Sequence, residues 1–373
     1  MRIAFLSTQR TWGGGENLLA QLITGCRRAG AEVGLAGPRD SELGRWAQGD
    51  ASVPWLPLPG RGRTPQAMWR LRKWCADGGY DAALLNDPHG ITYGGLALTG
   101  LGPPRVGVRH TVFPVRSAWK HQQLLERVVA VSKASKDGCL AAGINADHVE
   151  VIHGGVDPQP VSPAAIATAR AELDSIGGDA DGPMVLAVGS LLPVKGFDTL
   201  IEAVALAAQR GKLWRLAIAG KGPERQALEA LATRLGVAER VKLLGFRDDV
   251  ATLLHAADAF VSASHNEGLS LVVIEAMLAG CPVAATPVGG AREVLSVDDA
   301  NESPFARTFP PGDAEAMAVA IEASLEPTEA NASRVEVAKR WANEHFTVDR
   351  MARDYRALFE RLVSQRAGRR IAA

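Results

Sequence analysis

Short apolar runs alternate with segments of helical periodicity along the whole 373-residue chain. The pattern begins with an apolar run at 2–7, continues through a glycine-rich loop, and then shows apolar residues at helical spacing over 16–29. Such alternation is typical of parallel sheets with crossover helices. In the first half we expect strands at 32–36, 51–58, 81–85, 105–109, 127–132 and 149–153, and helices near 65–77, 90–99 and 133–142.

The same alternation restarts after a Pro- and Gly-containing stretch near 157–183, where we place the domain boundary. Two Rossmann-like series predict an α/β fold of two doubly wound domains that face each other across a deep cleft. We expect an N-terminal domain over 1–158, a C-terminal domain over 159–345, and a helix over 346–373 that packs back on the N-terminal domain and frays at 366–370. In the second half we expect strands at 184–189, 213–219, 241–245, 259–262 and 282–286, and helices at 197–210, 224–235, from 250, 271–279, and near 313–325, 332–344 and 348–364.

The composition is that of a globular protein, with 22% charged residues and 41 basic against 41 acidic side chains. This balance argues against a nucleic-acid partner. The charge is unevenly placed, because residues 1–158 carry 18 basic and 13 acidic side chains and the remainder carries 23 and 28. Four cysteines without a C-x-x-C pair indicate reduced thiols in a cytoplasmic protein. No uncharged apolar run reaches the length of a membrane span, and we expect the N-terminus to form a strand and not a signal peptide.

A glycine-rich turn, Trp12–Glu16, joins the first predicted strand to the first predicted helix. The backbone N–H groups of Gly13 and Gly14 can point at an anion there, because no Cβ keeps a phosphate or sugar away. Such a turn can also serve geometry alone. It lacks the G-x-G-x-x-G spacing and the Walker lysine, which disfavours nicotinamide and P-loop sites.

A second candidate site is the segment Ser264–Met277, where Glu267 follows a predicted strand and Glu275 comes eight residues later on the next helix. A carboxylate can accept two hydrogen bonds from vicinal hydroxyls, and the N–H groups that open the helix suit a diphosphate. An acidic pair that only complements the helix dipole is the alternative explanation.

The chain resembles the retaining family 4 glycosyltransferases of the GT-B fold, through GGGE, VGVRHT, VSKASKDGCLAAG, LAVGSLLPVKGFDTLIEA, LAIAGKGPER, VKLLGFRDDV and HNEGLSLVVIEAMLAGCPVAATPVGGAREVL. By this resemblance, Glu275 would bind the ribose of a nucleotide sugar, and Lys195 would neutralise its diphosphate. Gly13 and Gly14 would approach the same phosphates. The remaining implied donor contacts are Glu267, with the N–H groups of Gly268, Leu269 and Ser270.

Ser190 departs from the resemblance, because the family usually has arginine there as a second diphosphate cation. Arg247, Lys221 and Arg109 are candidate replacements, and the sequence does not choose among them. Ser190 is still assigned to the donor site. Recognition of the base is assigned to backbone groups around Gly245, Phe246 and Arg247.

His110 follows the predicted strand 105–109, at the edge where parallel sheets present functional groups. A lone strand-end histidine is more often structural, but the resemblance implies a catalytic role for His110 beside Lys195 and Glu267. We assign Glu16, His89 and Arg109 to the acceptor. Four other histidines are interpreted as surface or packing residues: His121, His148, His255 and His345.

We expect no metal or other cofactor, although Asp179 and Asp181 spell the D-x-D of metal-dependent transferases. They lie in a Gly-rich linker without a preceding strand, and we interpret them as solvated loop. The negative charge on the leaving diphosphate would then be stabilised by Lys195, the helix N-terminus and backbone N–H groups.

The resemblance implies transfer of a sugar from a nucleoside diphosphate to a glycan or lipid-linked acceptor, in assembly of lipopolysaccharide or exopolysaccharide. The basic and aromatic helix at 64–74 would fit peripheral contact with an anionic inner membrane, or it is a solvated helix with inward-facing Trp. The alternatives are a sugar-nucleotide epimerase of the same architecture and a non-catalytic nucleotide-sugar binding homologue. A glycoside hydrolase is disfavoured, because its two carboxylates flank one bond, whereas Glu267 and Glu275 share one loop and helix.

Overall fold

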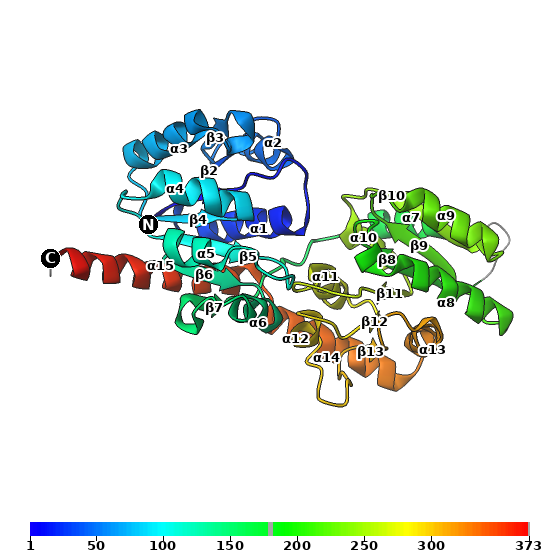
Figure 1. Ribbon diagram of the computed structural model, residues 1–373. Coiled ribbons are helices and arrows are strands. Elements are labelled where there is room, and N and C mark those ends of the chain that lie inside the picture. The colour runs from blue at the N-terminus through cyan, green and yellow to red at the C-terminus, as the bar shows by residue number, and fades with distance from the viewer. Residues whose placement is uncertain (178–181, 372–373) are drawn as a thin grey trace. The chain divides into compact units, whose positions relative to one another are not determined.

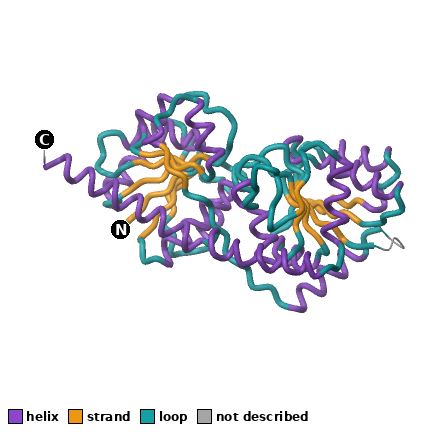
Figure 2. Tube along the Cα trace, turned by 90° about the horizontal axis from the view of Figure 1, so that it is seen from below, coloured by secondary structure: helices purple, strands orange, loops and turns teal. Residues whose placement is uncertain are grey.

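The computed structural model describes residues 1–177 and 182–371. It divides into two compact units, one formed by Met1–Asp157 with Phe346–Ala373 and the other by Pro158–His345. Each unit contains one parallel sheet with helices packed around it (Figures 1 and 2). The fold is therefore α/β, as the alternating sequence pattern predicts.

The first unit is built on a seven-stranded sheet of order β3-β2-β1-β4-β5-β6-β7, with every pairing parallel. Most residues of its strands are apolar, because both faces of the sheet are covered. The strand order reverses beside β1, which places a topological switch point between β1 and β4. The strands are β1 (Arg2–Leu6), β2 (Glu32–Pro38), β3 (Trp55–Leu58), β4 (Ala82–Leu85), β5 (Arg105–Arg109), β6 (Arg127–Ala130) and β7 (Val149–Val151).

Three helices of the first unit begin at polar caps: the hydroxyls of Ser41, Thr64 and Ser132 each accept a hydrogen bond from a first-turn N–H. The last helix of the chain packs closely on the first at Gly25. A Cβ on this residue would lie only 2.7 Å from Val348 Cγ1, so the contact requires glycine. The helices are α1 (Gly14–Arg28), α2 (Glu42–Gln48), α3 (Pro65–Gly78), a π-helical turn (Gly90–Gly94), α4 (Gly95–Leu98), α5 (Ala118–Leu124), α6 (Lys133–Ala141) and α15 (Val348–Ile371).

The second unit has a six-stranded parallel sheet of order β10-β9-β8-β11-β12-β13. Its strands are β8 (Met184–Val188), β9 (Arg215–Ala219), β10 (Val241–Gly245), β11 (Ala259–Ser262), β12 (Val283–Ala285) and β13 (Arg307–Thr308). Its helices are α7 (Pro163–Asp174), α8 (Phe197–Gln209), α9 (Arg225–Arg234), α10 (Val250–Ala256), α11 (Leu271–Ala279), α12 (Ala291–Val294), α13 (Ala314–Leu325) and α14 (Glu329–His345).

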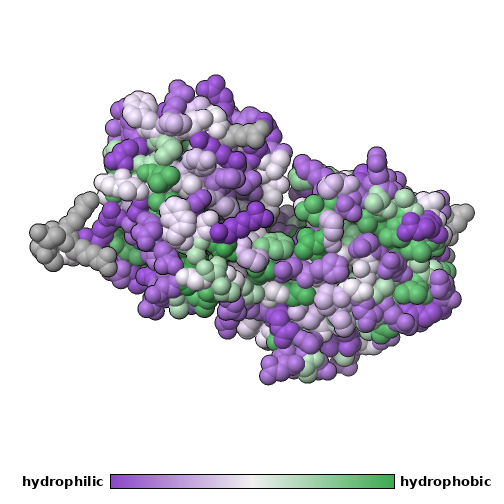
Figure 3. All heavy atoms as spheres, in the orientation of Figure 1, coloured by the Kyte–Doolittle hydropathy of each residue, from purple (hydrophilic) through white to green (hydrophobic). Residues whose placement is uncertain are grey.

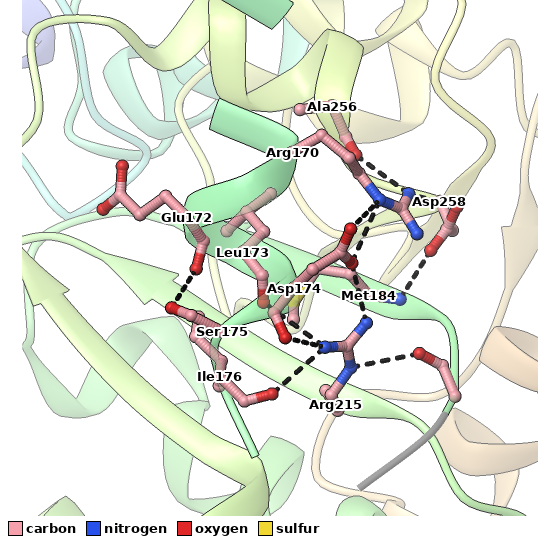
Figure 4. Close-up of polar contacts among 11 residues, drawn as sticks. Arg170, Glu172, Leu173, Asp174, Ser175, Ile176, Met184, Arg215, Ala256 and Asp258 are labelled. Carbon is pink, nitrogen blue, oxygen red and sulfur yellow. Dashed lines mark hydrogen bonds and ion pairs between the residues drawn. The ribbon is translucent and has the colours of Figure 1, made fainter. Parts of the chain in front are cut away.

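A cluster of arginines and aspartates fastens α7 to this sheet (Figure 4). Arg215, whose side chain is 7% exposed, donates to the carbonyl oxygens of Asp174 (2.8 Å) and Ile176 (3.1 Å) and to the Asp174 carboxylate (3.0 Å). Arg170 on α7 donates to Asp258 at 2.8 Å. A cation at the carbonyl end of a helix satisfies groups that the helix leaves unpaired, so Arg215 both ends α7 and holds it in place.

Several boundaries differ from the sequence expectation. The stretch near 157–183, expected to interrupt regular structure, contains α7, and the strand expected at 51–58 is limited to β3. The tail expected to fray at 366–370 continues α15, where Arg366 donates to Glu126 at 2.8 Å and to the Leu101 carbonyl at 3.1 Å. Partners distant in sequence therefore stabilise segments whose local pattern is weak.

No helix among the described residues is long and apolar enough to cross a membrane. Hydrophilic residues predominate on the face shown in Figure 3, with smaller hydrophobic areas between them. Large apolar side chains that are at least 45% exposed include Trp69, Leu96, Phe113, Trp119, Leu213, Phe246 and Val319.

Candidate functional site

A pocket of about 190 Å³ opens in the first unit at the carboxyl ends of β4 and β5. Parallel sheets bind ligands at this edge because loops and helix N-termini meet there. The pocket brings together three residues that the sequence assigned to function: Glu16, Arg109 and His110. The remaining lining residues are Gln9, Gly15, Asn86, Asp87, Pro88, Ile91, Val108, Thr111 and His121.

His110 is partly buried and joined to Asn86, with 2.8 Å between its Nε2 and the Asn86 Oδ1. Burial lowers the pKa of His110 from 6.5 to about 4, and the Arg109 charge acts in the same direction. The imidazole is therefore neutral at pH 7. Gly15 lies against the ring, because a Cβ there would be 3.3 Å from His110 Cδ2.

Glu16 lies in the first turn of α1 and is 7% exposed. Ser7 donates to its Oε1 at 3.3 Å, and Asn86 donates to the same oxygen at 3.5 Å. Burial raises the pKa of Glu16, which favours the protonated carboxyl. A Cβ at Gly14 would have no heavy atom within 4 Å, so the glycine turn leaves open space beside α1.

The other residues assigned to the acceptor lie differently. Arg109 donates to the Phe113 carbonyl and makes no ion pair among the described residues, and burial lowers its pKa. His89 is exposed and does not line the pocket. His121, interpreted from sequence as a surface or packing residue, is 7% exposed and does line it.

In the second unit, Lys195 and Glu267 meet at the carboxyl edge of the sheet. Lys195 Nζ donates to Glu267 Oε1 at 2.6 Å, and Ser264 Oγ donates to the same oxygen at 2.7 Å. Gly196 makes this approach feasible, since its φ is +63° and a Cβ would be 2.2 Å from the Ala263 carbonyl oxygen. The cluster therefore depends on a loop that needs glycine.

The loop then enters α11 through Ser270, a residue with φ +72°. The carboxyl of Glu275, on the second turn of α11, makes no hydrogen bond or ion pair with any described residue. Burial raises the pKa of Glu275 from 4.5 to about 7. Gly290 N donates to the Glu267 carbonyl at 3.0 Å, which fixes the loop backbone beside Gly268.

The cations proposed to replace the arginine absent at Ser190 are not equivalent. Arg247 is held by Asp249 (2.7 Å) and Glu172 (2.5 Å), and these hydrogen bonds raise its pKa. Lys221 makes no ion pair among the described residues, and its Nζ lies 4.9 Å from the centroid of the Phe246 ring. Its carbonyl accepts a hydrogen bond from Leu191 N at 3.0 Å, directly beyond Ser190. Lys221 is thus the cation that remains available beside this loop.

No group of three or more His, Cys, Asp or Glu side chains in residues 1–177 and 182–371 is placed to hold a metal ion. Asp179 and Asp181 lie outside the described residues.

Two family descriptions match complementary parts of the chain: "Glycosyltransferase Family 4" over residues 12–160 and "Glycosyl transferases group 1" over residues 182–326. The chain belongs to the family 4, group 1 glycosyltransferases. The resemblance read from the motifs is thereby confirmed, and the two-sheet α/β fold is that of GT-B glycosyltransferases.

Curated glycosyltransferases match the chain over part of their length. The lipopolysaccharide core biosynthesis glycosyltransferase LpsE of Rhizobium meliloti is 40% identical over 151 residues, covering 39% of this chain and 42% of LpsE. A D-inositol 3-phosphate glycosyltransferase of Xylanimonas cellulosilytica is 35% identical over 190 residues, which cover 47% of this chain and 45% of that relative. The matches thus span somewhat less than half of these two relatives.

One solved structure matches along almost the whole chain. Anabaena HepE in complex with UDP and glucose superposes with a TM-score of 0.82 at 26% identity, over 96% of this chain and 99% of HepE. The likeness therefore covers both units.

The sequence did not single out three residues that the structure joins to the candidate groups: Asn86, Asp87 and Ser264. Asp87 accepts hydrogen bonds from the backbone and hydroxyl of Thr8, both at 2.6 Å, and so fastens the end of β4 to the loop after β1. Asn86 and Asp87 directly follow the predicted strand 81–85, so their position at a carboxyl edge was the available signal.

Proposed function

We propose that this chain is a retaining, metal-independent glycosyltransferase that moves a sugar from a nucleoside diphosphate sugar to a hydroxyl acceptor. The observation that carries the proposal is the cluster of Lys195, from the loop after β8, with Ser264 and Glu267, from the loop before α11. On that helix, the carboxyl of Glu275 has no hydrogen bond or ion pair with a described residue. A cation near a helix N-terminus suits a diphosphate, and a free carboxyl suits the vicinal hydroxyls of a ribose.

UDP-glucose is the first donor to test. HepE, which is similar over both units, has been solved with UDP, with UDP-glucose, and with UDP and glucose. Phe246 and the backbone around Gly245 are assigned to the base. Phe246 is 58% exposed and immediately follows β10, so its ring is accessible to a planar ligand.

In the proposed reaction, the bond between the anomeric carbon and the diphosphate oxygen breaks. The acceptor oxygen forms its bond to that carbon on the same face, and the acceptor proton passes to the departing phosphate oxygen. Lys195 and the N–H groups of Gly268, Leu269 and Ser270 stabilise the negative charge that develops on the diphosphate. Lys221 supplies the second cation.

The acceptor is assigned to the first unit, where Glu16, Arg109 and His110 line one pocket. A hydroxyl can bind the neutral imidazole of His110, and Arg109 offers a cation that has no carboxylate partner among the described residues. We propose a glycan or lipid-linked acceptor in bacterial surface-glycan assembly at the cytoplasmic face, which the name of LpsE supports.

We further propose that the first unit docks on an anionic membrane. Trp69 on α3 and Trp119 on α5 are 63% and 60% exposed, and Arg72, Lys73 and Arg116 are exposed in the same unit. Exposed tryptophans beside cations are typical of surfaces that bind the bilayer interface. The inward-facing alternative does not hold for Trp69.

The test is thermal stability with UDP, GDP, ADP, dTDP and their sugars, because a ligand at 100 times its Kd stabilises by about 2.7 kcal/mol. We expect one nucleotide to raise the Tm of the wild type and of Glu202→Ala, a control at an exposed position of α8, but not of Glu275→Ala. No shift with any nucleotide would refute the donor site.

Product analysis separates the alternatives. An epimerase would convert the donor when no acceptor is present. A binding homologue would bind the donor without turning it over, and the Ser190→Arg variant would regain turnover. A product with the inverted anomer would contradict retention.

A further inference from the structure

Four polar groups of the first unit form one hydrogen-bonded series that ends at the His110 ring. Ser7 and Asn86 both donate to Glu16 Oε1, and Asn86 Oδ1 lies 2.8 Å from His110 Nε2. Asn86 is 1% exposed. A buried amide with defined partners has little freedom to turn.

The partners of Asn86 determine which way its amide points. Its Nδ2 donates to the Gly15 carbonyl at 3.3 Å as well as to Glu16 Oε1 at 3.5 Å. The reversed amide would set its oxygen against the Gly15 carbonyl oxygen, which has no hydrogen to donate. Oδ1 therefore faces His110, and an amide oxygen can only accept.

It follows that the proton of the neutral His110 ring is on Nε2. The other nitrogen, Nδ1, makes no hydrogen bond with any described residue, and His110 lines the pocket. The Cδ2 edge is covered by Gly15. Nδ1 is consequently the polar atom of the ring that is left for a ligand.

We propose that Asn86 is a positioning residue that holds His110 as its Nε2–H tautomer, so that Nδ1 accepts a hydrogen bond from a substrate hydroxyl in the pocket. His110 then acts as a neutral acceptor that orients the hydroxyl, and it carries no charge to the reaction. The identity of that hydroxyl, on a donor sugar or an acceptor, rests on the proposed function. The assignment of the tautomer is independent of the proposed function.

The charged groups around the ring explain how the state is maintained. Glu16 on α1, Asp87 after β4, Arg109 on β5 and His121 on α5 line the same pocket. Asp87 favours the imidazolium, whereas Arg109 and burial oppose it. Asp87 already accepts hydrogen bonds from Thr8 and from the N–H groups of His89 and Gly90, so its charge is stabilised away from the ring.

The test is nuclear magnetic resonance of the ligand-free full chain with ¹⁵N- and ¹³C-labelled histidines, His110 being assigned by its loss in His110→Gln. In the wild type we expect a proton on Nε2, an unprotonated Nδ1, and no titration of this ring between pH 6 and 8. In Asn86→Leu the acceptor is removed, and we expect the Nδ1–H tautomer to become populated. In the nearly isosteric Asn86→Asp we expect the pKa of His110 to rise by about one unit or more.

Asn331→Leu is the matched control, because Asn331 is a buried amide of the second unit that is 7% exposed and donates to two backbone carbonyls. It should leave the His110 signals unchanged. A proton on Nδ1 in the wild type would overturn the proposal. An unchanged tautomer and an unchanged His110 pKa in Asn86→Asp would also overturn it. Asn86→Asp therefore keeps the test decisive if Asn86→Leu does not fold.

Release of UDP from UDP-glucose, measured on the same variants, is a separate readout. Asn86→Asp should lose turnover as pH falls below its raised His110 pKa, and this loss should occur at a higher pH than in the wild type. If no variant releases UDP and none binds it, the proposed function fails while the assignment of the tautomer stands.

Discussion

Lys195 and Glu267 form an ion pair, with 2.6 Å between Nζ and Oε1 and side-chain exposures of 24% and 12%. Ser264 donates to the same carboxylate oxygen. A diphosphate that binds Lys195 must therefore compete with, or join, an existing partner. The pair holds the lysine in place before a donor arrives, which limits the ordering that binding requires.

The first prediction concerns this pair. Lys195→Met and Glu267→Gln should each lower the free energy of unfolding by about 1–2 kcal/mol, because each leaves a partly buried charge without its partner. The double variant should lose less than the sum, with a coupling energy of about 1 kcal/mol. Urea denaturation measures all three.

The same cycle on Lys73 and Asp77, an exposed pair on α3 at 2.8 Å, is the control and should give no more than about 0.5 kcal/mol. A coupling at Lys195 and Glu267 no larger than this would show that the pair does not hold the loop.

The second prediction follows from the raised pKa of Glu275, which burial moves from 4.5 to about 7. The folded state binds this proton more tightly than the unfolded state does, so the free energy of unfolding falls as pH rises from 4.5 to 7. Glu275→Gln removes this loss. We expect the variant to become more stable than the wild type by about 1–3 kcal/mol at pH 7, with the advantage disappearing below pH 4.5.

Affinity should change in the opposite direction. Glu275→Gln should weaken UDP binding by about tenfold or more, because hydrogen bonds to a charged group contribute about 1.5–3 kcal/mol. Calorimetric titration at pH 8 measures the change. Equal affinities would remove Glu275 from the donor site, and parallel stability profiles would contradict its raised pKa.

The third prediction concerns Ser270, which has φ +72° and makes no side-chain hydrogen bond as the residue before α11. A Cβ in this conformation costs about 1–2 kcal/mol, part of which glycine returns as unfolded-state entropy. Ser270→Gly should raise the free energy of unfolding by about 0.5–1 kcal/mol, and Ser270→Ala should not. Thermal denaturation distinguishes the two, and an equal gain in both variants would count against strain.

The fourth prediction concerns the membrane surface. Trp69→Ser and Trp119→Ser should each weaken binding to phosphatidylglycerol-containing vesicles by about tenfold, since a buried aromatic side chain contributes about 1.5–3 kcal/mol. Leu213→Ser, on a 46% exposed residue of the second unit, is the control. Cosedimentation at two salt concentrations gives the affinity and its electrostatic part. Binding that is equal in all variants would exclude this surface.

Much of the fold was predictable because strands such as β5 and β11 carry short apolar runs at the positions expected, over 106–108 and 259–261. Helix α7 was missed because it follows a Pro-containing segment and its alanines give little periodicity, while Arg215, 41 residues from Asp174, supplies the contacts that fix its end. Local patterns do not contain such a partner.

The candidate site divides in the same way. Glu267 and Glu275 lie on one loop and helix, so their spacing in sequence was enough to associate them. Asn86 and His110 belong to the ends of neighbouring strands and are 24 residues apart. Their pairing depends on the register that sets Leu85 beside Gly107, which only the assembled sheet provides.

Helix α15 has a consequence for the order of synthesis. The chain completes the second unit before it returns to the first, where Arg350 donates to the carbonyls of His153 (2.6 Å) and Gly154 (3.0 Å) and Val348 fills the space beside Gly25. On the ribosome, the unit that begins first can be completed only last. Until residues 346–371 emerge, the α1 surface around Gly25 lacks the helix that covers it, so the nascent first unit exposes this surface to other chains.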